Sequence, residues 1–322
     1  MRPPFDPELV PIERVINEAR LPFWPLSDEK LQALRAMYRA MHSVEPPDLT
    51  AGGRVRLEER QVPGPVGEPD ITLLILSPVD VNGPRPGIYY VHGGGMITGD
   101  RRAGVSTFLP YVADGSAVLV SVEYRLAPEH PDPAPVEDCY AGILWTTEQA
   151  AELGIDTDRL FIAGISSGGG LAAGTALLAR DRGFPRISHQ VLVWPMLDDR
   201  FETHSSQMID QEEAWDRNQN LYGWTALLGE RRGGPDVSQY AAPARAADLA
   251  GLPRTYIDTG SAEVFRDEVV TYAQRLSEAG VSVDLHMWGG GFHGFEMWAP
   301  QARVSQASMA TRDEFMRRAL ET

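Results

Sequence analysis

Two adjacent serines stand in a glycine-rich stretch, AGISSGGG, at residues 163–170. The segment GISSG fits the G-x-S-x-G pattern, in which a serine at a sharp strand-to-helix turn projects its hydroxyl from the sheet. The pattern selects Ser166, because selecting Ser167 would require a glycine at the position of Ile165. A short apolar run precedes the turn and a small-residue helix follows it. By itself the motif also fits a glycine-rich turn with solvated serines, so other residues must show whether Ser166 is a nucleophile.

A second glycine-rich loop, VHGGGMITGD, follows an apolar run at residues 91–100. Acyl transfer needs backbone N–H groups aimed at a developing oxyanion, and side chains there would obstruct them. The first N–H of the helix after the turn, at Ser167, is a further donor of this kind. A phosphate-binding loop is excluded, because the spacing is not G-x-G-x-x-G and no lysine follows. We expect His92 to hydrogen-bond the backbone of its own loop rather than to act as a metal ligand or base.

A serine nucleophile needs a neighbouring base, and His293 in WGGGFHGFE is the best placed of seven histidines, just past the last expected strand. The chain order serine, acid, histidine puts the orienting carboxylate between the two. Among the acids of TYIDTGSAEVFRDE, Glu263 lies in the loop and is the first choice, with Asp267 as the reserve. Acids at Asp267 and Glu268 are expected at a helix start for its dipole alone.

Apolar runs separated by helical segments position these residues. RVRLEERQV and ITLLILSPV predict an early strand pair, and later runs such as GIYYV, AVLVSVEY, LFIAG, HQVLVWP and TYIDTG predict a sheet buried on both faces. In VSVDLHMW, the alternation of Val281, Val283, Leu285 and Met287 predicts one buried face. The fold class is therefore α/β, with a mostly parallel central sheet flanked by helices.

Two helical segments do not belong to this alternation of strands and helices. The first covers residues 1–52, and the second is an insertion at about 198–250 within a catalytic domain of residues 53–322. Ligands of such sheets bind at the carboxyl ends of the strands, so the insertion is placed to cover a site there. We expect the N-terminal helices to complete this helical cap.

Composition narrows the function further. The formal net charge of −16 argues against a nucleic-acid or anionic membrane surface. Lys30 is the only lysine, which disfavours Schiff-base chemistry, and Cys139 is the only cysteine, which we expect to pack in a helix. We expect no metal and no cofactor. The N-terminus has no apolar signal region and no window reaches membrane-spanning length, which predicts a cytoplasmic protein.

Several of these stretches together resemble the hormone-sensitive-lipase-like esterases of the α/β-hydrolase superfamily. HGGG at 92–95 resembles the family's oxyanion signature, YRLAPEHPDPAPVEDC its YRLAPE stretch, GISSGG its GDSAGG turn, EVFRDE its DPLRDE and FHGF its HGF. The resemblance runs from about residue 55 to the C-terminus. It implies Ser166 as nucleophile, His293 as base and Glu263 as acid. It also implies oxyanion donors at Gly94 with Gly93 or Gly95, and at Ser167.

Three departures from the family pattern stand near the site. Glu263 takes the position of an Asp, Ile165 replaces the Asp before the serine, and Ser167 replaces an Ala without removing the backbone donor. The sequence thus predicts a serine carboxylesterase for short acyl esters, acetyl to about hexanoyl, the chain length being implied by the resemblance. Amide hydrolysis and a non-catalytic small-ligand receptor on the same scaffold are the alternatives. We expect a homodimer through the edge strand near 281–288.

Overall fold

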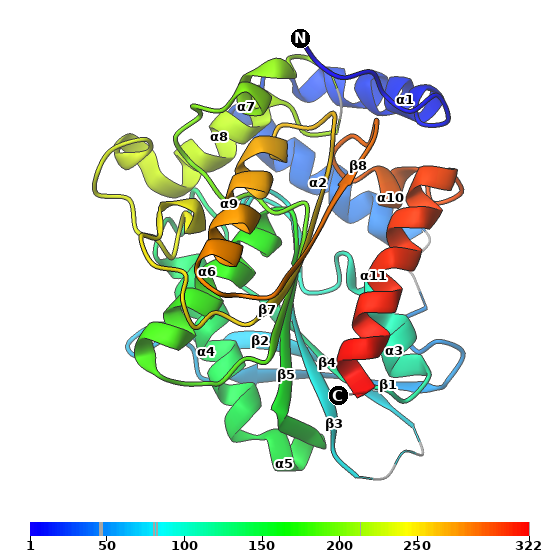
Figure 1. Ribbon diagram of the computed structural model, residues 1–322, viewed down its shortest axis with the longest axis vertical. Coiled ribbons are helices and arrows are strands. Elements are labelled where there is room, and N and C mark those ends of the chain that lie inside the picture. Colours follow the sequence, from blue (N-terminus) through cyan, green and yellow to red (C-terminus); the bar gives the residue numbers. More distant parts are fainter. Residues whose placement is uncertain (45–47, 80, 82, 213, 322) are drawn as a thin grey trace.

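The computed structural model describes residues 1–44, 48–79, 81, 83–212 and 214–321. An eight-stranded sheet forms its centre, with the strand order β1-β2-β4-β3-β5-β6-β7-β8 (Figure 1). The strands are β1 Val55–Val62, β2 Ile71–Pro78, β3 Arg85–Val91, β4 Val118–Glu123, β5 Ile155–Ile165, β6 His189–Val193, β7 Arg254–Gly260 and β8 Val283–Trp288.

The predicted early strand pair is confirmed, because β1 and β2 pair antiparallel and β2 pairs antiparallel with β4. All other neighbours in the sheet are parallel. The parallel register places Val91 beside Gly164, and Ile165 beside Val193. The loops that follow β3, β5 and β6 therefore start close together at the carboxyl edge of the sheet. The predicted α/β class with a mostly parallel sheet is confirmed.

Helices cover both faces of the sheet, as its apolar strands require. One face carries α4 Ala134–Glu148, α5 Ala150–Leu153, α6 Ser167–Arg182 and α9 Arg266–Glu278. The other carries the 3₁₀ turn η2 Val105–Thr107, α3 Leu109–Ala113 and α11 Arg303–Glu321. Tyr89 and Tyr90 illustrate the strand alternation, since these neighbours in β3 belong to the two different cores. Cys139 is buried in α4, as expected.

The remaining helices gather at the carboxyl edge of the sheet, at the top of Figure 1. From the N-terminal segment come α1 Val10–Arg20, η1 Leu21–Phe23 and α2 Asp28–Val44. Between β6 and β7 come α7 His204–Met208, α8 Arg217–Leu228, η3 Gly229–Arg231 and η4 Pro243–Arg245, and α10 Phe295–Trp298 follows β8. The two helical segments do meet, since Arg20 pairs with Asp216 at 2.9 Å and Tyr222 donates to Asp28 at 2.7 Å.

The prediction for the last strand is wrong. Leu285 and Met287 are 39% and 54% exposed, so the face that they share with Val283 is open along most of its length. The opposite face of β8 packs inward instead, where Trp288 donates to the buried carboxylate of Asp258 at 3.3 Å. Val283 packs against the core on the α9 side of the sheet, but Leu285 and Met287 stay exposed on that side, because β8 is an edge strand with a neighbouring strand on one side only.

No helix among the described residues is long and apolar enough to cross a membrane.

Candidate active site

Ser166 occupies the turn between β5 and α6 in a strained conformation. Its φ of 58° and ψ of −124° lie in a region that non-glycine residues rarely adopt. Three backbone hydrogen bonds hold it there: its N–H donates to Val193 O at 2.8 Å, and its carbonyl accepts from Gly170 N and Met196 N. The turn also needs Gly168, because a Cβ there would overlap the carbonyl oxygens of Val91 and His92. These contacts hold the strained turn and so fix the position of the Ser166 hydroxyl at the start of the helix.

A chain of hydrogen bonds links Ser166 to a histidine and a carboxylate. His293 Nε2 lies 2.9 Å from Ser166 Oγ, and His293 Nδ1 lies 2.6 Å from Glu263 Oε2. All three side chains are buried, and Glu263 is fully so. This is the order of contacts that a nucleophile, its base and the orienting acid require. The structure therefore brings together the three residues that the sequence singled out.

Glu263 is fixed from its other oxygen as well. Its Oε1 accepts from Thr259 Oγ1 and from Gly260 N, each at 2.6 Å. Both partners come from the end of β7 and had no motif to mark them in the sequence. The reserve acid, Asp267, is engaged elsewhere: it accepts from Ser205 N at 2.8 Å and pairs with Arg266. Glu263 thus holds the position next to His293.

Two aromatic rings support the imidazole of His293. Trp194 packs edge-on at a ring distance of 5.8 Å, and Phe265 packs edge-on at 5.0 Å. Trp194 follows β6 with a positive φ of 43°, and Phe265 directly precedes α9. Such contacts restrict rotation of the imidazole between its two hydrogen-bond partners.

The glycine loop after β3 lies directly against the serine turn. A Cβ built at Gly93 would stand 3.3 Å from Ser166 Cβ. The backbone N–H groups of Gly94, Gly95 and Ser167 have no acceptor among the described residues. These N–H groups are therefore free to donate to a bound oxygen.

The loop is pinned from several sides. Ser167 Oγ accepts from Met96 N at 3.1 Å, so this second serine joins the loop to the turn rather than facing His293. His92 Nδ1 contacts Gly93 O at 2.8 Å and its ring stacks on Tyr124, which confirms that it bonds the backbone of its own loop. Burial lowers the pKa of His92 and so favours its neutral form. From the N-terminal segment, Arg35 donates to Ile97 O at 2.7 Å.

A second carboxyl lies behind the site. Glu268, at the start of α9, accepts from Leu197 N at 2.7 Å and from Asp198 N at 3.2 Å. Burial raises the pKa of Glu268 well above its usual range, and the nearby charges of Asp198 and Glu263 add to this. The residue holds the chain as it leaves β6 and turns toward α7.

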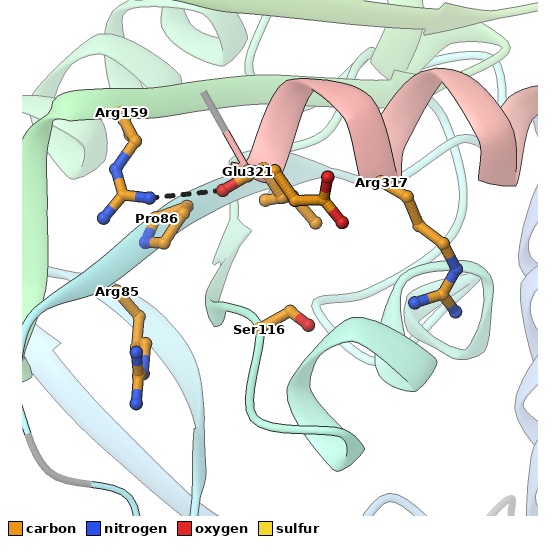
Figure 2. Close-up of a pocket in the computed structure, with 7 residues that line it drawn as sticks. Arg85, Pro86, Ser116, Arg159, Arg317 and Glu321 are labelled. Carbon is orange, nitrogen blue, oxygen red and sulfur yellow. Dashed lines mark hydrogen bonds between the residues drawn. The ribbon is translucent and has the colours of Figure 1, made fainter.

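A different hollow, of about 170 Å³, lies at the amino end of the strands and is lined by three arginines (Figure 2). Two of these arginines form ion pairs or hydrogen bonds with other residues of the protein. Arg159 pairs with Asp156 and donates to Leu320 O at 3.2 Å, and Arg317 pairs with Asp114 and Asp313. Since parallel α/β sheets bind ligands at the carboxyl ends of their strands, the Ser166 end remains the candidate site. Among the residues described, no group of three acidic, histidine or cysteine side chains is arranged to hold a metal.

Known proteins resemble the chain over most of its length. A family model described as alpha/beta hydrolase fold matches residues 88–297. A carboxylesterase of Mycobacterium tuberculosis, NlhH, is 33% identical over 91% of this chain and 90% of its own.

Two solved structures agree with this result. A bacterial heroin esterase is 40% identical, covers 99% of this chain with 98% of its own and superposes with a TM-score of 0.89. The esterase LipW of Mycobacterium marinum is 33% identical over 92% of each chain, with a TM-score of 0.83. The chain therefore belongs to the hormone-sensitive-lipase-like esterases of the α/β-hydrolase superfamily.

Proposed function

We propose that this carboxylic ester hydrolase cleaves short-chain acyl esters, from acetyl to about hexanoyl, through an acyl-enzyme formed on Ser166. The observation that carries the proposal is the continuous hydrogen-bonded path from Ser166 Oγ through His293 to Glu263. A non-catalytic receptor on the same scaffold has no need of a strained serine with a base and an acid in line.

In the first half of the reaction, Ser166 Oγ attacks the ester carbonyl carbon while His293 Nε2 takes its proton. Glu263 holds the imidazole in the tautomer that has its free lone pair on Nε2, and its negative charge stabilises the imidazolium. The new Oγ–C bond forms, the bond from that carbon to the alkoxy oxygen breaks, and His293 returns the proton to the leaving alcohol.

In the second half, water replaces the alcohol. His293 takes a proton from the water, the water oxygen bonds to the acyl carbon, and the Oγ–C bond breaks as the proton returns to Ser166. The products are the carboxylic acid and the free enzyme.

Backbone donors stabilise the negative charge that develops on the carbonyl oxygen in both halves. The candidates are the N–H groups of Gly94, of Gly93 or Gly95, and of Ser167. Loss of one such donor costs about 10²–10³ in rate in comparable sites. In this proposal no metal or organic cofactor takes part, and the substrate is a small-molecule ester rather than a nucleic acid or a membrane.

The helical segments 1–52 and about 198–250 act as the cap of this site. The buried ion pair between Arg20 and Asp216 joins them, and Arg35 ties the first segment to the glycine loop. Ser166 and His293 are only 8% and 7% exposed, which supports a site enclosed by these segments.

Two further proposals concern assembly and location. β8 is an edge strand, so the backbone of a second copy of β8 can pair with it to form a homodimer. The side chains of Leu285 and Met287 on this strand are exposed and can pack against the second copy. Light scattering of the wild type and of Leu285→Arg tests this, since a monomeric wild type contradicts it. A cytoplasmic location is supported by the lone buried thiol of Cys139, and cell fractionation tests it.

The function is tested by labelling the protein with a fluorophosphonate and mapping the modified residue by mass spectrometry. Turnover of a matched pair of substrates, p-nitrophenyl acetate and p-nitroacetanilide, is measured on the same sample. We expect label on Ser166 and faster hydrolysis of the ester. Label on Ser167 would contradict the nucleophile, faster hydrolysis of the amide would favour an amidase, and a folded protein without label or turnover would favour a receptor.

A further inference from the structure

A tryptophan from the cap lies against the glycine loop. The ring of Trp215, just before α8, occupies the space that a Cβ at Gly95 would need, so this side chain and the loop are in direct contact. Gly95 follows Gly93, the residue beside Ser166, by only two positions, at most about 8 Å of chain. Trp215 therefore lies against the loop that adjoins Ser166.

Helix α8 approaches the same point closely. A Cβ at Gly223 would stand 3.1 Å from Gly95 O and 3.5 Å from the Trp215 ring. The indole is 7% exposed, and its N–H has no hydrogen-bond partner among the residues that the structure describes. The ring thus fills the space between the glycine loop and α8.

The chemistry of the ester decides which part of the substrate meets this wall. The carbonyl oxygen must point into the glycine loop, and the alkoxy oxygen must lie within reach of His293 Nε2 to be protonated. His293 is flanked by Trp194 and Phe265, whereas Trp215 stands on the glycine loop. The third substituent of the carbonyl carbon, the acyl chain, is left for the space beside the loop.

We propose that Trp215 sets the acyl-chain limit of the enzyme by closing the space beside Gly95, and that the buried Arg20–Asp216 ion pair holds it in place. Trp215 is then a specificity-determining residue, and Arg20 is a positioning residue that acts through it. The inference rests on the proposed ester hydrolysis at Ser166 and adds to it the feature that selects short acyl groups.

The positioning contacts converge on the residue next to Trp215. Asp216 is fully buried, and its Oδ1 caps α8 by accepting from Asn218 N and Gln219 N. Its Oδ2 lies 2.9 Å from Arg20 Nη1 and accepts from Trp24 Nε1 at 3.1 Å.

Both of these partners of Oδ2 belong to the N-terminal segment. The only lysine of the chain, Lys30, donates to Trp24 O at 2.8 Å and so secures the same junction. Because a buried carboxylate is strongly destabilised without its cation, loss of Arg20 must disturb the start of α8 and with it Trp215.

The first experiment measures kcat/KM of Trp215→Ala, Trp215→Phe and the wild type for p-nitrophenyl esters from acetate to decanoate. A second series keeps the acetyl group and varies the alcohol. We expect the decanoate-to-acetate ratio to rise about tenfold or more in Trp215→Ala, less in Trp215→Phe, with the alcohol series unchanged. Trp145→Ala is the matched control, because Trp145 lies in the last turn of α4, toward the amino ends of the strands, and should leave both series unchanged.

The second experiment tests the positioning role by a double-mutant cycle. Arg20→Met should raise the decanoate-to-acetate ratio in the wild-type background but not in the Trp215→Ala background. Trp24→Phe, which removes one neutral hydrogen bond to Asp216, is the milder variant should Arg20→Met fail to fold. An equal effect of either change in both backgrounds would overturn the positioning role.

The two levels of the proposal fail in different ways. If Trp215→Ala hydrolyses acetate and keeps the wild-type chain-length profile, or if only the alcohol series responds, the inference is wrong and the ester hydrolysis stands. If the wild type itself turns over no ester, the proposed function fails first.

Discussion

Ser167 Oγ lies 3.1 Å from Met96 N and accepts its hydrogen, so the serine after Ser166 ties the glycine loop to the turn. This hydroxyl is fully buried, and at this position the family pattern has an alanine without such a group. The two neighbouring serines therefore have different roles: one presents its hydroxyl to His293, and the other fixes the loop that carries the proposed oxyanion donors.

Replacing each serine separately distinguishes the two roles. We expect Ser166→Ala to lower kcat by about 10⁶, because the nucleophile is lost. We expect Ser167→Ala to keep ester turnover but to lower the free energy of unfolding by about 1–3 kcal/mol, because Met96 N–H is left without its partner. Steady-state kinetics and urea unfolding followed by tryptophan fluorescence measure both effects. Loss of turnover in a stable Ser167→Ala protein would contradict this division.

Substitutions of Glu263 separate the effect of its negative charge from the effect of its side-chain length. Glu263→Gln keeps the length of the side chain but removes its charge, and we expect kcat to fall by about 10⁴, with KM little changed. Glu263→Asp restores the carboxylate but shortens it while Thr259 Oγ1 and Gly260 N still hold it back, so a loss of about 10–100-fold is expected. If Glu263→Asp is as impaired as Glu263→Gln, the position of the carboxylate matters more than its charge.

Much of this site could be predicted from the sequence because its parts are local. The turn at Ser166, the glycine loop and the stretch around His293 each directly follow a strand that the sequence predicts, and parallel strands bring such positions to one edge. The contacts that set the cap are not local. Arg20 and Asp216 are joined across 196 positions of the chain, and neither stands in a motif.

The error at β8 has a related cause. Leu285 and Met287 alternate with His286 and Trp288 as a half-buried strand should, but only the topology reveals that β8 is an edge strand with a neighbour on one side only. Thr259 was missed for another reason. Its contact with Glu263 depends on how the loop after β7 folds back, and no motif in the sequence of that loop predicts its conformation.

A buried carboxylate near the histidine loop gives a prediction on pH and stability. Burial, together with the charge of Glu296, raises the pKa of Asp258 to about 7. Its partners are Tyr256 Oη at 2.9 Å and Trp288 Nε1 at 3.3 Å, and Arg312 opposes the shift. The folded state thus binds this proton more tightly than the unfolded state, so stability is lost as the pH rises from about 4 to about 7.

Asp258→Asn removes this titration. As the pH rises from 4.5 to 8, we expect the free energy of unfolding of the variant to increase relative to that of the wild type, by on the order of a few kcal/mol. The Tm of the variant should rise relative to that of the wild type over the same range. Differential scanning fluorimetry across this range measures the difference. A difference that stays constant with pH would show that Asp258 has the same pKa in both states.

Glu268 offers the complementary case of a carboxyl that acts through its oxygen rather than its charge. Because burial raises its pKa well above the usual range, the neutral form is favoured, and Oε1 still accepts from Leu197 N and Asp198 N. Glu268→Gln keeps that oxygen, so we expect the free energy of unfolding at neutral pH to change by less than about 1 kcal/mol. Glu268→Ala leaves two buried N–H groups without an acceptor and should cost about 2–6 kcal/mol. Urea unfolding of both variants decides, and equal losses would mean that the negative charge, not the acceptor, stabilises the chain after β6.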